Sequence, residues 1–268
     1  MGSKTKIAPN ILSRLPSGNR FVDLFGGGFA MSHCAMLMKK WQAVLYNEYD
    51  PLIPPLIKRA LAGEFNYNRF KPEFITSEEF LKKKDKDGYI KTVWSFGNNG
   101  SNYLFSKEIE PYKKEAHDFV VFGKPTKHFK VIEKHVKSKD ISQRRLQFCG
   151  ACKKLKKRFD LEQLQQLERL QQLERLEQLE IRQGSYSDYE YQKGDIVYCD
   201  PPYEGTAGYT YGFDHKKFYE WVKSRKYQVW FSSYQGIKGF KMVWAKQLRS
   251  SYGSGNKSIN YECLYTNK

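Results

Sequence analysis

The sequence lacks a long hydrophobic run. No apolar stretch approaches the roughly 20 consecutive residues that a membrane span requires. The segment from Met1 to Pro16 also lacks the apolar core and the small-residue cleavage site of an export signal. Cysteine is scarce as well: the 268 residues contain 5, an odd number scattered along the chain, which argues against a disulfide framework. We therefore expect a soluble protein of a reducing cytoplasm that does not bind membranes.

Acidic residues are in short supply relative to basic ones. The chain has 29 Asp and Glu against 46 Lys and Arg, which gives a formal net charge of +17 at pH 7. Such an excess favours a polyanionic partner, nucleic acid above all. Hydrophobic residues still make up 40% and aromatic residues 16% of the chain, so the sequence is not that of a disordered protein and can build a core.

Two separated parts of the sequence show the alternation of strands and helices that is typical of an α/β fold. The expected strands are 21–25, 43–46, 195–199, 228–231, 240–244 and 260–265, and the expected helices are 29–41 and 215–223. The alternation stops after Gly63 and resumes at Gly194. The sequence therefore predicts one α/β fold that is split by an insertion.

Within the insertion, aromatic runs at 92–96 and 103–105 flank Gly97-Asn98-Asn99-Gly100, a pattern that indicates a β-hairpin with polar groups at its tip. Residues 124–158 then carry 13 Lys or Arg and only 2 acidic residues, a local charge of +11. A run this dense is usually a solvated face, but beside an aromatic hairpin we favour a nucleic-acid surface. The candidate contacts are Asn98, Asn99, Lys124, Lys127, Lys130, Arg144, Arg145, Lys153 and Lys154.

Leucine recurs at every third position from Leu161 to Leu179. On a helix, successive leucines at this spacing lie about 300° apart, so the row winds around the surface and does not form a coiled-coil seam. The intervening Gln, Glu and Arg residues are strong helix formers. We expect a helix whose turns pack against different neighbours, with a short solenoid-like segment as the alternative.

The glycine triplet after the first strand is typical of a turn that lets a cofactor approach the backbone closely. Met31 stands where a dinucleotide-binding turn would have its third glycine, which disfavours a nicotinamide enzyme. Glu48, at the end of the second strand, can accept hydrogen bonds from ribose hydroxyls. These features indicate an adenosine-containing cofactor; a plain tight turn with a surface glutamate is the alternative.

The segment Asp200-Pro201-Pro202-Tyr203 is a more specific motif. Its two prolines end the preceding strand and fix a rigid loop with exposed carbonyls. The Asp200 carboxylate and the Pro201 carbonyl would present two acceptors to the two hydrogens of an amino group, while Tyr203 can stack on a planar base. An ordinary turn with a core tyrosine is the alternative.

One cysteine pair matches half of a zinc-site pattern. Cys149-Gly-Ala-Cys152 has the right spacing, but no second pair follows it, and only His128 and His135 are at hand to complete a site. We therefore expect two helix cysteines and no bound metal.

Taken together, these segments resemble the Dam-like, alpha-group adenine-specific DNA methyltransferases, especially those of phages and prophages. The matching stretches are Gly2-Ser3-Lys4, 21–28, Asn47-Glu48, 196–203 and, more loosely, Ser232-Ser233-Tyr234 and Glu262. The resemblance implies a Rossmann-like S-adenosylmethionine-dependent methyltransferase fold formed by residues 1–63 and 183–268. It also implies that residues 64–182 are an inserted, mainly helical target recognition domain containing a β-hairpin.

The same resemblance implies the reaction: a methyl group passes from S-adenosylmethionine to the N6 amine of an adenine flipped out of double-stranded DNA. The catalytic motif would be Asp200, Pro201, Pro202 and Tyr203. The cofactor would contact Lys4, Asp23, Phe25, Gly26, Gly28, Glu48, Tyr186 and Asp200, with Asp23 near its methionine part and Glu48 on its ribose. Such enzymes work in the cytoplasm of bacterial or phage-infected cells, with or without a partner restriction nuclease.

Two other functions fit the same residues. The motif recognises an amino group, so the same chemistry can modify RNA or another planar amine, although the basic insertion favours a duplex. The third function is a non-catalytic DNA-binding module. The intact Gly26, Asp200, Pro201 and Tyr203 argue against it.

Overall fold

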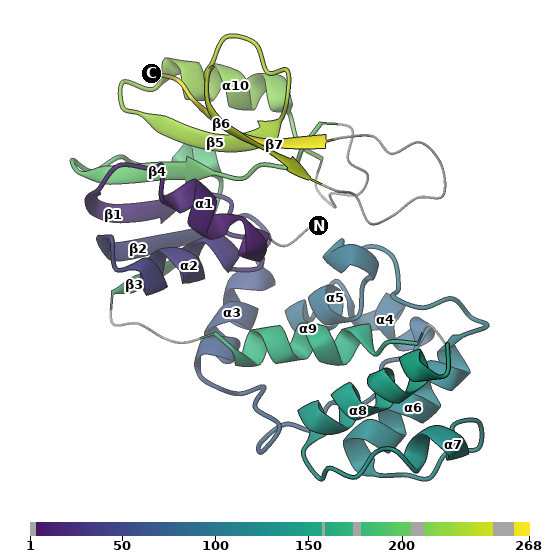
Figure 1. The fold of residues 1–268 in the computed structure, drawn as a ribbon. Helices are drawn as coiled ribbons and strands as arrows, with labels where there is room; N and C mark the ends of the chain where they lie inside the picture. The colour runs from purple at the N-terminus through teal and green to yellow at the C-terminus, as the bar shows by residue number, and fades with distance from the viewer. Residues whose placement is uncertain (1–3, 157–158, 174–177, 205–211, 249–259) are drawn as a thin grey trace. The chain divides into compact units, whose positions relative to one another are not determined.

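The computed structural model describes residues 4–156, 159–173, 178–204, 212–248 and 260–268 (Figure 1). The chain forms two compact units. We call the first the sheet unit, which comprises Gly2–Pro54 and Arg175–Lys268, and the second the helical unit, which comprises Pro55–Glu174. The helical unit therefore begins and ends several residues before the insertion predicted at 64–182. The predicted Gly2-Ser3 match and Leu176 of the leucine row lie outside the described residues.

The sheet unit contains a seven-stranded sheet with the order β3-β2-β1-β4-β5-β7-β6. The strands are β1 (Gly18–Asp23), β2 (Trp41–Glu48), β3 (Leu179–Gln183), β4 (Asp195–Cys199), β5 (Val229–Tyr234), β6 (Lys241–Leu248) and β7 (Asn260–Thr266). The first five are parallel, and β7 is antiparallel to β5 and β6. The strand order reverses at β1, between β2 and β4, which is where open α/β sheets bind ligands at the carboxyl ends of their strands. The predicted Rossmann-like sheet is confirmed.

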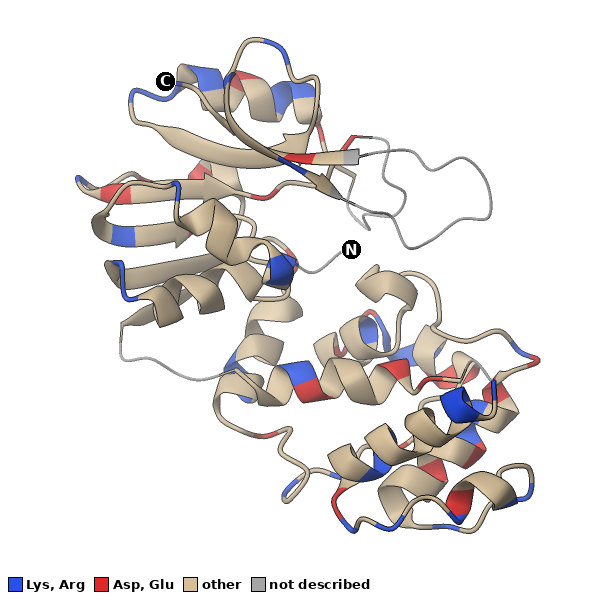
Figure 2. Cartoon of the chain, viewed as in Figure 1, with Lys and Arg blue, Asp and Glu red and all other residues tan. Residues whose placement is uncertain are grey.

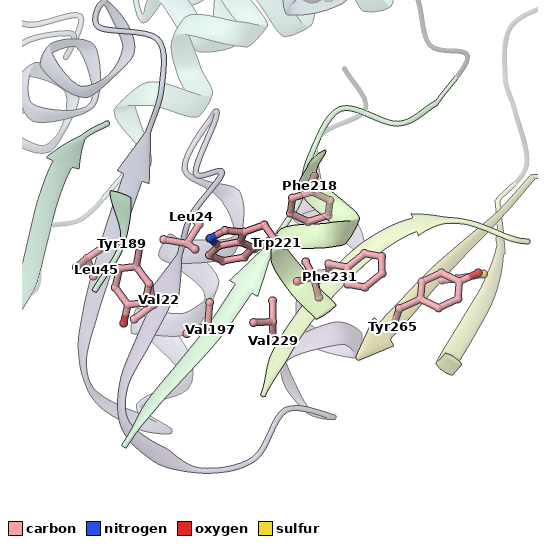
Figure 3. Packing of buried hydrophobic residues seen from close by; sticks show 13 residues of the cluster. Val22, Leu24, Leu45, Tyr189, Val197, Phe218, Trp221, Val229, Phe231 and Tyr265 are labelled. Carbon is pink, nitrogen blue, oxygen red and sulfur yellow. The ribbon is translucent and has the colours of Figure 1, made fainter. Parts of the chain in front are cut away.

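Successive residues of a strand point to opposite faces of the sheet. Strands that are apolar throughout therefore need helices on both faces. On one face, α10 (His215–Ser224) packs Phe218 against a cluster that includes Val22 and Val197 (Figure 3). On the other side, α1 (Ala8–Leu12) contacts α2 (Ala30–Met38), and α2 contacts β1 and β2 (Figure 1). On this side, the ring of Phe21 packs at a tilt against that of Trp41, with centroids 5.0 Å apart. Both faces of the central strands are therefore buried, as their continuous apolar runs predict.

Arg20 ties β1 to its neighbours. Its guanidinium donates two hydrogen bonds to Asp195 on β4, at 3.0 and 3.1 Å, and one to Glu180 on β3, at 3.1 Å. The Asp195 side chain is only 3% exposed. Burial alone would raise the pKa of Asp195, but hydrogen bonds from Arg20 and Tyr189 hold that pKa below its usual value. The pair is thus a buried, bidentate ion pair at the start of β4.

The helical prediction for the leucine row is confirmed for α9 (Glu162–Gln171) and wrong at Leu179, which begins β3. Leu179 pairs with Val44 of β2, and these edge hydrogen bonds override the weak preference of the segment for a helix. As expected for a row that winds around its helix, the leucines divide between two apolar clusters, Leu161 and Leu164 in one and Leu167 and Leu170 in the other.

The helical unit is built around these two clusters. Its helices are α3 (Ile53–Leu61), α4 (Ser77–Lys83), α5 (Gly88–Val93), α6 (Glu110–Phe122), α7 (Lys130–Glu133), α8 (Ile141–Lys154) and α9. Side chains of Thr76, Asp87 and Asp140 cap the amino ends of α4, α5 and α8. A buried histidine, His117, bonds the Pro72 carbonyl at 2.9 Å, and burial lowers its pKa to about 4. His117 therefore stays neutral at physiological pH and serves packing.

The predicted β-hairpin at 92–105 is only partly formed: backbone hydrogen bonds join Phe96 to Asn102 and Leu104 to Trp94, at 2.8 and 3.0 Å, but no full strand forms on either side. Helix α5 occupies the start of the first predicted strand, and one antiparallel bridge joins Ser95 to Tyr103. Between them, the Ser95 hydroxyl accepts a hydrogen bond from the Gly100 amide at 3.0 Å, and the Asn99 side chain accepts two from the following backbone. The chain does reverse here, but Trp94 is fully buried in the helical core. Packing of such aromatics favours a helix and a turn over two paired strands.

Replacement of Asp195 by Asn should destabilise the protein by about 3 kcal/mol, because it removes the buried carboxylate that pairs with Arg20 and leaves only the exposed Glu180. The matched control is Arg59→Ala, which removes the pair with Glu64, whose side chains are 39% and 45% exposed. That change should cost less than about 1 kcal/mol. Urea unfolding measures both free energies.

The same pair sets a pH dependence. The pKa of Asp195 is lower in the folded chain than in the unfolded one, where it is about 3.9. The contribution of Asp195 to the free energy of unfolding is therefore complete above its unfolded pKa and is lost as pH falls through its folded pKa. The difference between the wild type and Asp195→Asn should shrink toward pH 3. A difference that does not change with pH would count against the ion pair.

Candidate active site

Three acidic residues singled out in the sequence lie at the carboxyl ends of adjacent strands. Asp23 is the last residue of β1, Glu48 is the last residue of β2, and Asp200 directly follows β4. Because β2, β1 and β4 are parallel neighbours, these residues share one edge of the sheet. That edge is the point where the strand order reverses, so the fold itself assembles the candidate site.

The glycine turn after β1 is tightly packed on one side. The Gly26 amide donates to the Asn47 carbonyl at 2.8 Å, and a Cβ on Gly26 would lie 2.1 Å from the ring of Tyr46. Only glycine therefore fits at this position. Around Gly28, in contrast, no described atom lies within 4 Å of an added Cβ, and the residue is exposed. The turn thus presents an open backbone surface, as close approach of a cofactor requires.

Asp23 is a buried carboxylate with one unused acceptor. Its Oδ2 accepts a hydrogen bond from the Ser32 hydroxyl at 2.7 Å. Its Oδ1 is buried and has no hydrogen-bond partner among the described residues. Burial raises the pKa of Asp23 to about 7, although the hydrogen bond from Ser32 opposes that shift. Such an oxygen suits a cationic or N–H group of a ligand.

Glu48 holds the glycine turn in place. Its Oε2 accepts from the Gly27 amide at 2.7 Å, and its Oε1 accepts from the Asp50 amide at 3.0 Å. Burial raises the pKa of Glu48, and these backbone hydrogen bonds counteract the rise. A carboxylate has about four lone-pair sites, so acceptor capacity remains for a hydroxyl group of a ligand.

An aromatic wall lies beside the turn. Phe25 and Tyr186 stack with ring centroids 5.2 Å apart, and Phe213 and Phe218 contact Phe25 edge-on. Tyr186 belongs to η3 (Tyr186–Asp188), a short 3₁₀ helix. The structure therefore brings the two aromatic residues predicted for the cofactor next to each other, in a surface that suits a planar ring.

A compact charged cluster surrounds the motif after β4. Lys4, in η1 (Lys4–Lys6), places its Nζ 3.1 Å from Asp200 Oδ1 and 2.8 Å from Glu262 Oε1 on β7. The Tyr203 hydroxyl lies 3.1 Å from Asp200 Oδ1 and also hydrogen-bonds Glu262 Oε1 and Lys4 Nζ. We call Lys4, Asp200, Tyr203 and Glu262 the Lys4 cluster. It joins residues from widely separated parts of the sequence.

Two members of the Lys4 cluster differ from expectation. The resemblance assigns Lys4 to the cofactor, but the structure places its ammonium beside Asp200 and Glu262. Glu262 was noted only as a loose match and was given no role. The signal that points to it is a single acid within an otherwise apolar strand, where a buried carboxylate needs a partner. Burial would lower the pKa of Lys4, but the two carboxylates raise it, so Lys4 stays protonated.

The prolines and the ring of Tyr203 are fixed by neighbours. Pro201 is buried, and the Pro202 carbonyl bonds His215 Nε2 at 2.7 Å. The ring of Tyr203 meets Tyr234 of β5 edge-on, with centroids 4.7 Å apart. His215 was expected only as the start of a helix, and in the structure it holds the loop that contains the motif.

The residues predicted to bind nucleic acid all lie in the helical unit and fall into two groups. Arg145 makes a bidentate pair with Glu168 at 2.9 and 2.6 Å, and Arg144 donates to the Phe119 carbonyl. Asn98 Nδ2 lies 3.4 Å from Gln166 Oε1, and Asn99 bonds within its own turn. These side chains already have structural partners.

The other group consists of exposed lysines, namely Lys124, Lys127, Lys130, Lys153 and Lys154. Among these, Lys124 pairs with Asp118 at 3.3 Å. Figure 2 shows that basic residues are spread over the loops and helices of the helical unit, with acidic residues among them. Over residues 124–156, lysine therefore carries most of the positive charge that lies at the surface.

No group of three or more His, Cys, Asp or Glu side chains within the described ranges is arranged to hold a metal ion. Cys152 is buried in an apolar cluster on α8, and Cys149 is partly buried beside it. Among the helices that the structure describes, none has the length and apolar character needed to cross a membrane.

Known proteins resemble the chain to different degrees. An rRNA methyltransferase, aviRa from Streptomyces viridochromogenes, aligns with 12% identity and a TM-score of 0.38, over 98% of this chain and 84% of that one. No curated protein sequence matches. Residues 1–226 match the D12 class N6 adenine-specific DNA methyltransferases, a range that includes the glycine turn and the motif at 200–203. The chain belongs to this family, and it is a DNA adenine methyltransferase.

Proposed function

We propose that the sheet unit transfers a methyl group from S-adenosylmethionine to the N6 amine of an adenine flipped from duplex DNA, and that the helical unit recognises the target. The observation that carries this proposal is the gathering of Asp23, Glu48 and Asp200 at one sheet edge. The glycine turn precedes the helical unit in sequence and the Asp-Pro-Pro-Tyr motif follows it, which supports the Dam-like, alpha-group, phage-type assignment. A cytoplasmic location stays a prediction.

The residues at the glycine turn fit S-adenosylmethionine. The open backbone at Gly28 allows close approach, and the unused Oδ1 of Asp23 suits the α-amino group of the methionine part. Glu48 would accept from the ribose hydroxyls, and the wall of Phe25 and Tyr186 would contact the adenine ring. When bound, the cofactor supplies an electrophilic methyl group on a sulfonium sulfur.

Asp200 and the Pro201 carbonyl would accept the two hydrogens of the N6 amine, since His215 already bonds the Pro202 carbonyl. These acceptors favour a more tetrahedral nitrogen and stabilise the positive charge that develops on it. The N6 lone pair forms the new bond to the methyl carbon, the carbon–sulfur bond breaks with its electrons going to sulfur, and N6 then releases one proton to water. Tyr203 would stack on the flipped base.

The first test is incubation with radiolabelled S-adenosylmethionine and unmethylated duplex DNA, followed by nucleoside analysis. Label in N6-methyladenine is the expected result. Asp200→Ala should reduce turnover at least about 10³-fold, because it removes an acceptor that acts in the transition state, while cofactor binding and salt-sensitive DNA binding persist. Glu220→Ala, on the exposed face of α10, is the control and should leave turnover unchanged. Label that enters RNA alone would overturn the DNA substrate.

Cofactor binding should depend on the charge of Asp23. With a pKa of about 7 in the free protein, the ionised fraction rises about eightfold between pH 6 and 7.5, and the dissociation constant of S-adenosylmethionine should fall by about that factor. The Asp23→Asn variant should bind S-adenosylmethionine at least tenfold more weakly than the wild type, and its dissociation constant should not show this pH dependence. Equilibrium dialysis across that pH range measures both effects.

Stability supplies the control for this variant. Because the folded pKa of Asp23 lies above the unfolded value of about 3.9, ionisation of Asp23 costs stability as pH rises toward 7. Asp23→Asn removes that cost, so its melting temperature at pH 7.5 should be no lower than that of the wild type. A large drop would mean that Asp23 acts chiefly as a structural residue.

DNA affinity should depend steeply on salt, since each neutralised phosphate contributes about 0.9 to the slope of log K against log salt concentration. Lys153→Ala with Lys154→Ala should make the slope shallower by about 1 to 2 units. The matched control is Lys82→Ala with Lys83→Ala on α4, where both lysines pair with glutamates one helical turn away. Equal slopes for both double variants would remove these α8 lysines from the DNA contact.

A further inference from the structure

The Lys4 cluster holds one cation and two carboxylates. Lys4 Nζ lies closer to Glu262 Oε1, at 2.8 Å, than to Asp200 Oδ1, at 3.1 Å. The Glu262 side chain is 2% exposed, whereas that of Asp200 is 21% exposed. The ammonium is therefore shared between a deeply buried carboxylate, which cannot reach solvent, and the more accessible one that faces the substrate under the proposed function.

This sharing matters for the reaction because Lys4 competes with the substrate. Its ammonium donates to Oδ1 of Asp200, the carboxylate that the N6 amine would use. With Asp200 as its sole carboxylate partner in the cluster, Lys4 would form a neutral ion pair there, with little attraction for a nitrogen that becomes positive. The second carboxylate leaves the cluster with one net negative charge, which stabilises that positive charge.

We propose that Glu262 is a positioning residue for methyl transfer: it holds Lys4 and the Tyr203 hydroxyl, and so keeps the Asp200 carboxylate available to the target amine. This inference rests on the proposed role of Asp200. It adds that the Lys4 cluster, with one more carboxylate than ammonium, carries the net negative charge that stabilises the positive charge on the target nitrogen. Neither Glu262 nor Lys4 needs to touch the adenine for this to hold.

The surroundings of Glu262 couple its charge to Lys4. Burial, and then the neighbouring Asp200, raise the pKa of Glu262, while Lys4 lowers it. Lys246 lies opposite Glu262 in the strand register, but its side chain is exposed. Among the described residues, the titratable groups around Glu262 are Lys4 on η1, Asp200 and Tyr203 after β4, Tyr198 on β4, Tyr234 opposite it on β5, Lys246 opposite it on β6 and the adjacent Cys263.

A cycle of three variants tests the charge balance. Glu262→Gln keeps the shape and an acceptor oxygen but neutralises the cluster, and should lower kcat for DNA methylation about 10²-fold while the KM for S-adenosylmethionine changes less than about twofold. Lys4→Met leaves two carboxylates without their cation. One of them should then hold a proton to higher pH, which moves the acid limb of the kcat profile upward.

The double variant, Lys4→Met with Glu262→Gln, separates charge from packing. It restores one net negative charge, so its kcat should exceed that of Glu262→Gln by at least about tenfold, and its acid limb should return toward that of the wild type. If Lys4 and Glu262 serve only packing, the double variant will be as slow as Glu262→Gln or slower. That result overturns the inference.

Two further measurements keep the outcomes distinct. Glu262→Asp retains the charge and should keep more of kcat than Glu262→Gln. Glu262→Gln can be compared only if it folds, as judged by its melting temperature and cofactor binding. If it does not fold, the inference is tested by comparing the acid limb of the kcat profile of Lys4→Met with that of the double variant. A wild type that makes no N6-methyladenine would overturn the proposed function itself. An active wild type with a fully active Glu262→Gln would overturn only the role of Glu262.

Discussion

Four carboxylates near one edge of the sheet must be kept in an environment with little water, and the local structure is arranged around that constraint. An ionised carboxylate is costly to bury unless hydrogen bonds or cations compensate. Glu48 accepts hydrogen bonds from the backbone amides of Gly27 and Asp50. Asp200 and Glu262 share Lys4. Asp23 has no cation beside it among the described residues; Ser32 donates to its Oδ2, and burial raises its pKa. The site is thus short of positive charge, which suits a sulfonium cofactor and an amine that becomes cationic.

Local patterns in the sequence were sufficient to predict which residues gather at the carboxyl edge of the sheet. The glycine turn and the Asp-Pro-Pro-Tyr motif each follow a strand, so their position at the carboxyl edge follows from the parallel sheet alone. The pairing of Lys4 with Glu262 was not predictable in this way, because no periodicity connects residues so distant in the chain. Leu179 and Trp94 show the same limit: sheet pairing and burial in the helical core, respectively, overrode what their neighbours in sequence indicated.

Charge density in the sequence also proved a partial guide to the helical unit. The run at 124–158 is strongly basic. Within it, however, Arg144 donates to the Phe119 carbonyl and Arg145 donates to the Glu168 carboxylate. A planar guanidinium is well suited to such fixed, bidentate contacts, whereas a lysine ammonium on a flexible stem stays solvated. Composition alone does not distinguish an arginine that holds two helices together from a lysine that is available to a phosphate.

Two buried ionic groups in the sheet unit show how charge balance separates a structural role from a functional one. Arg20 pairs with the buried Asp195 in a closed, bidentate geometry, and its further contact, Glu180, is 58% exposed. The buried charges there cancel, so the pair stabilises the strands and offers nothing to a ligand. In the Lys4 cluster the carboxylates outnumber the ammonium, and this imbalance costs stability in the free protein. Such a cost is retained where a positive charge arrives during function, and the proposed methyl transfer at this sheet edge would bring one.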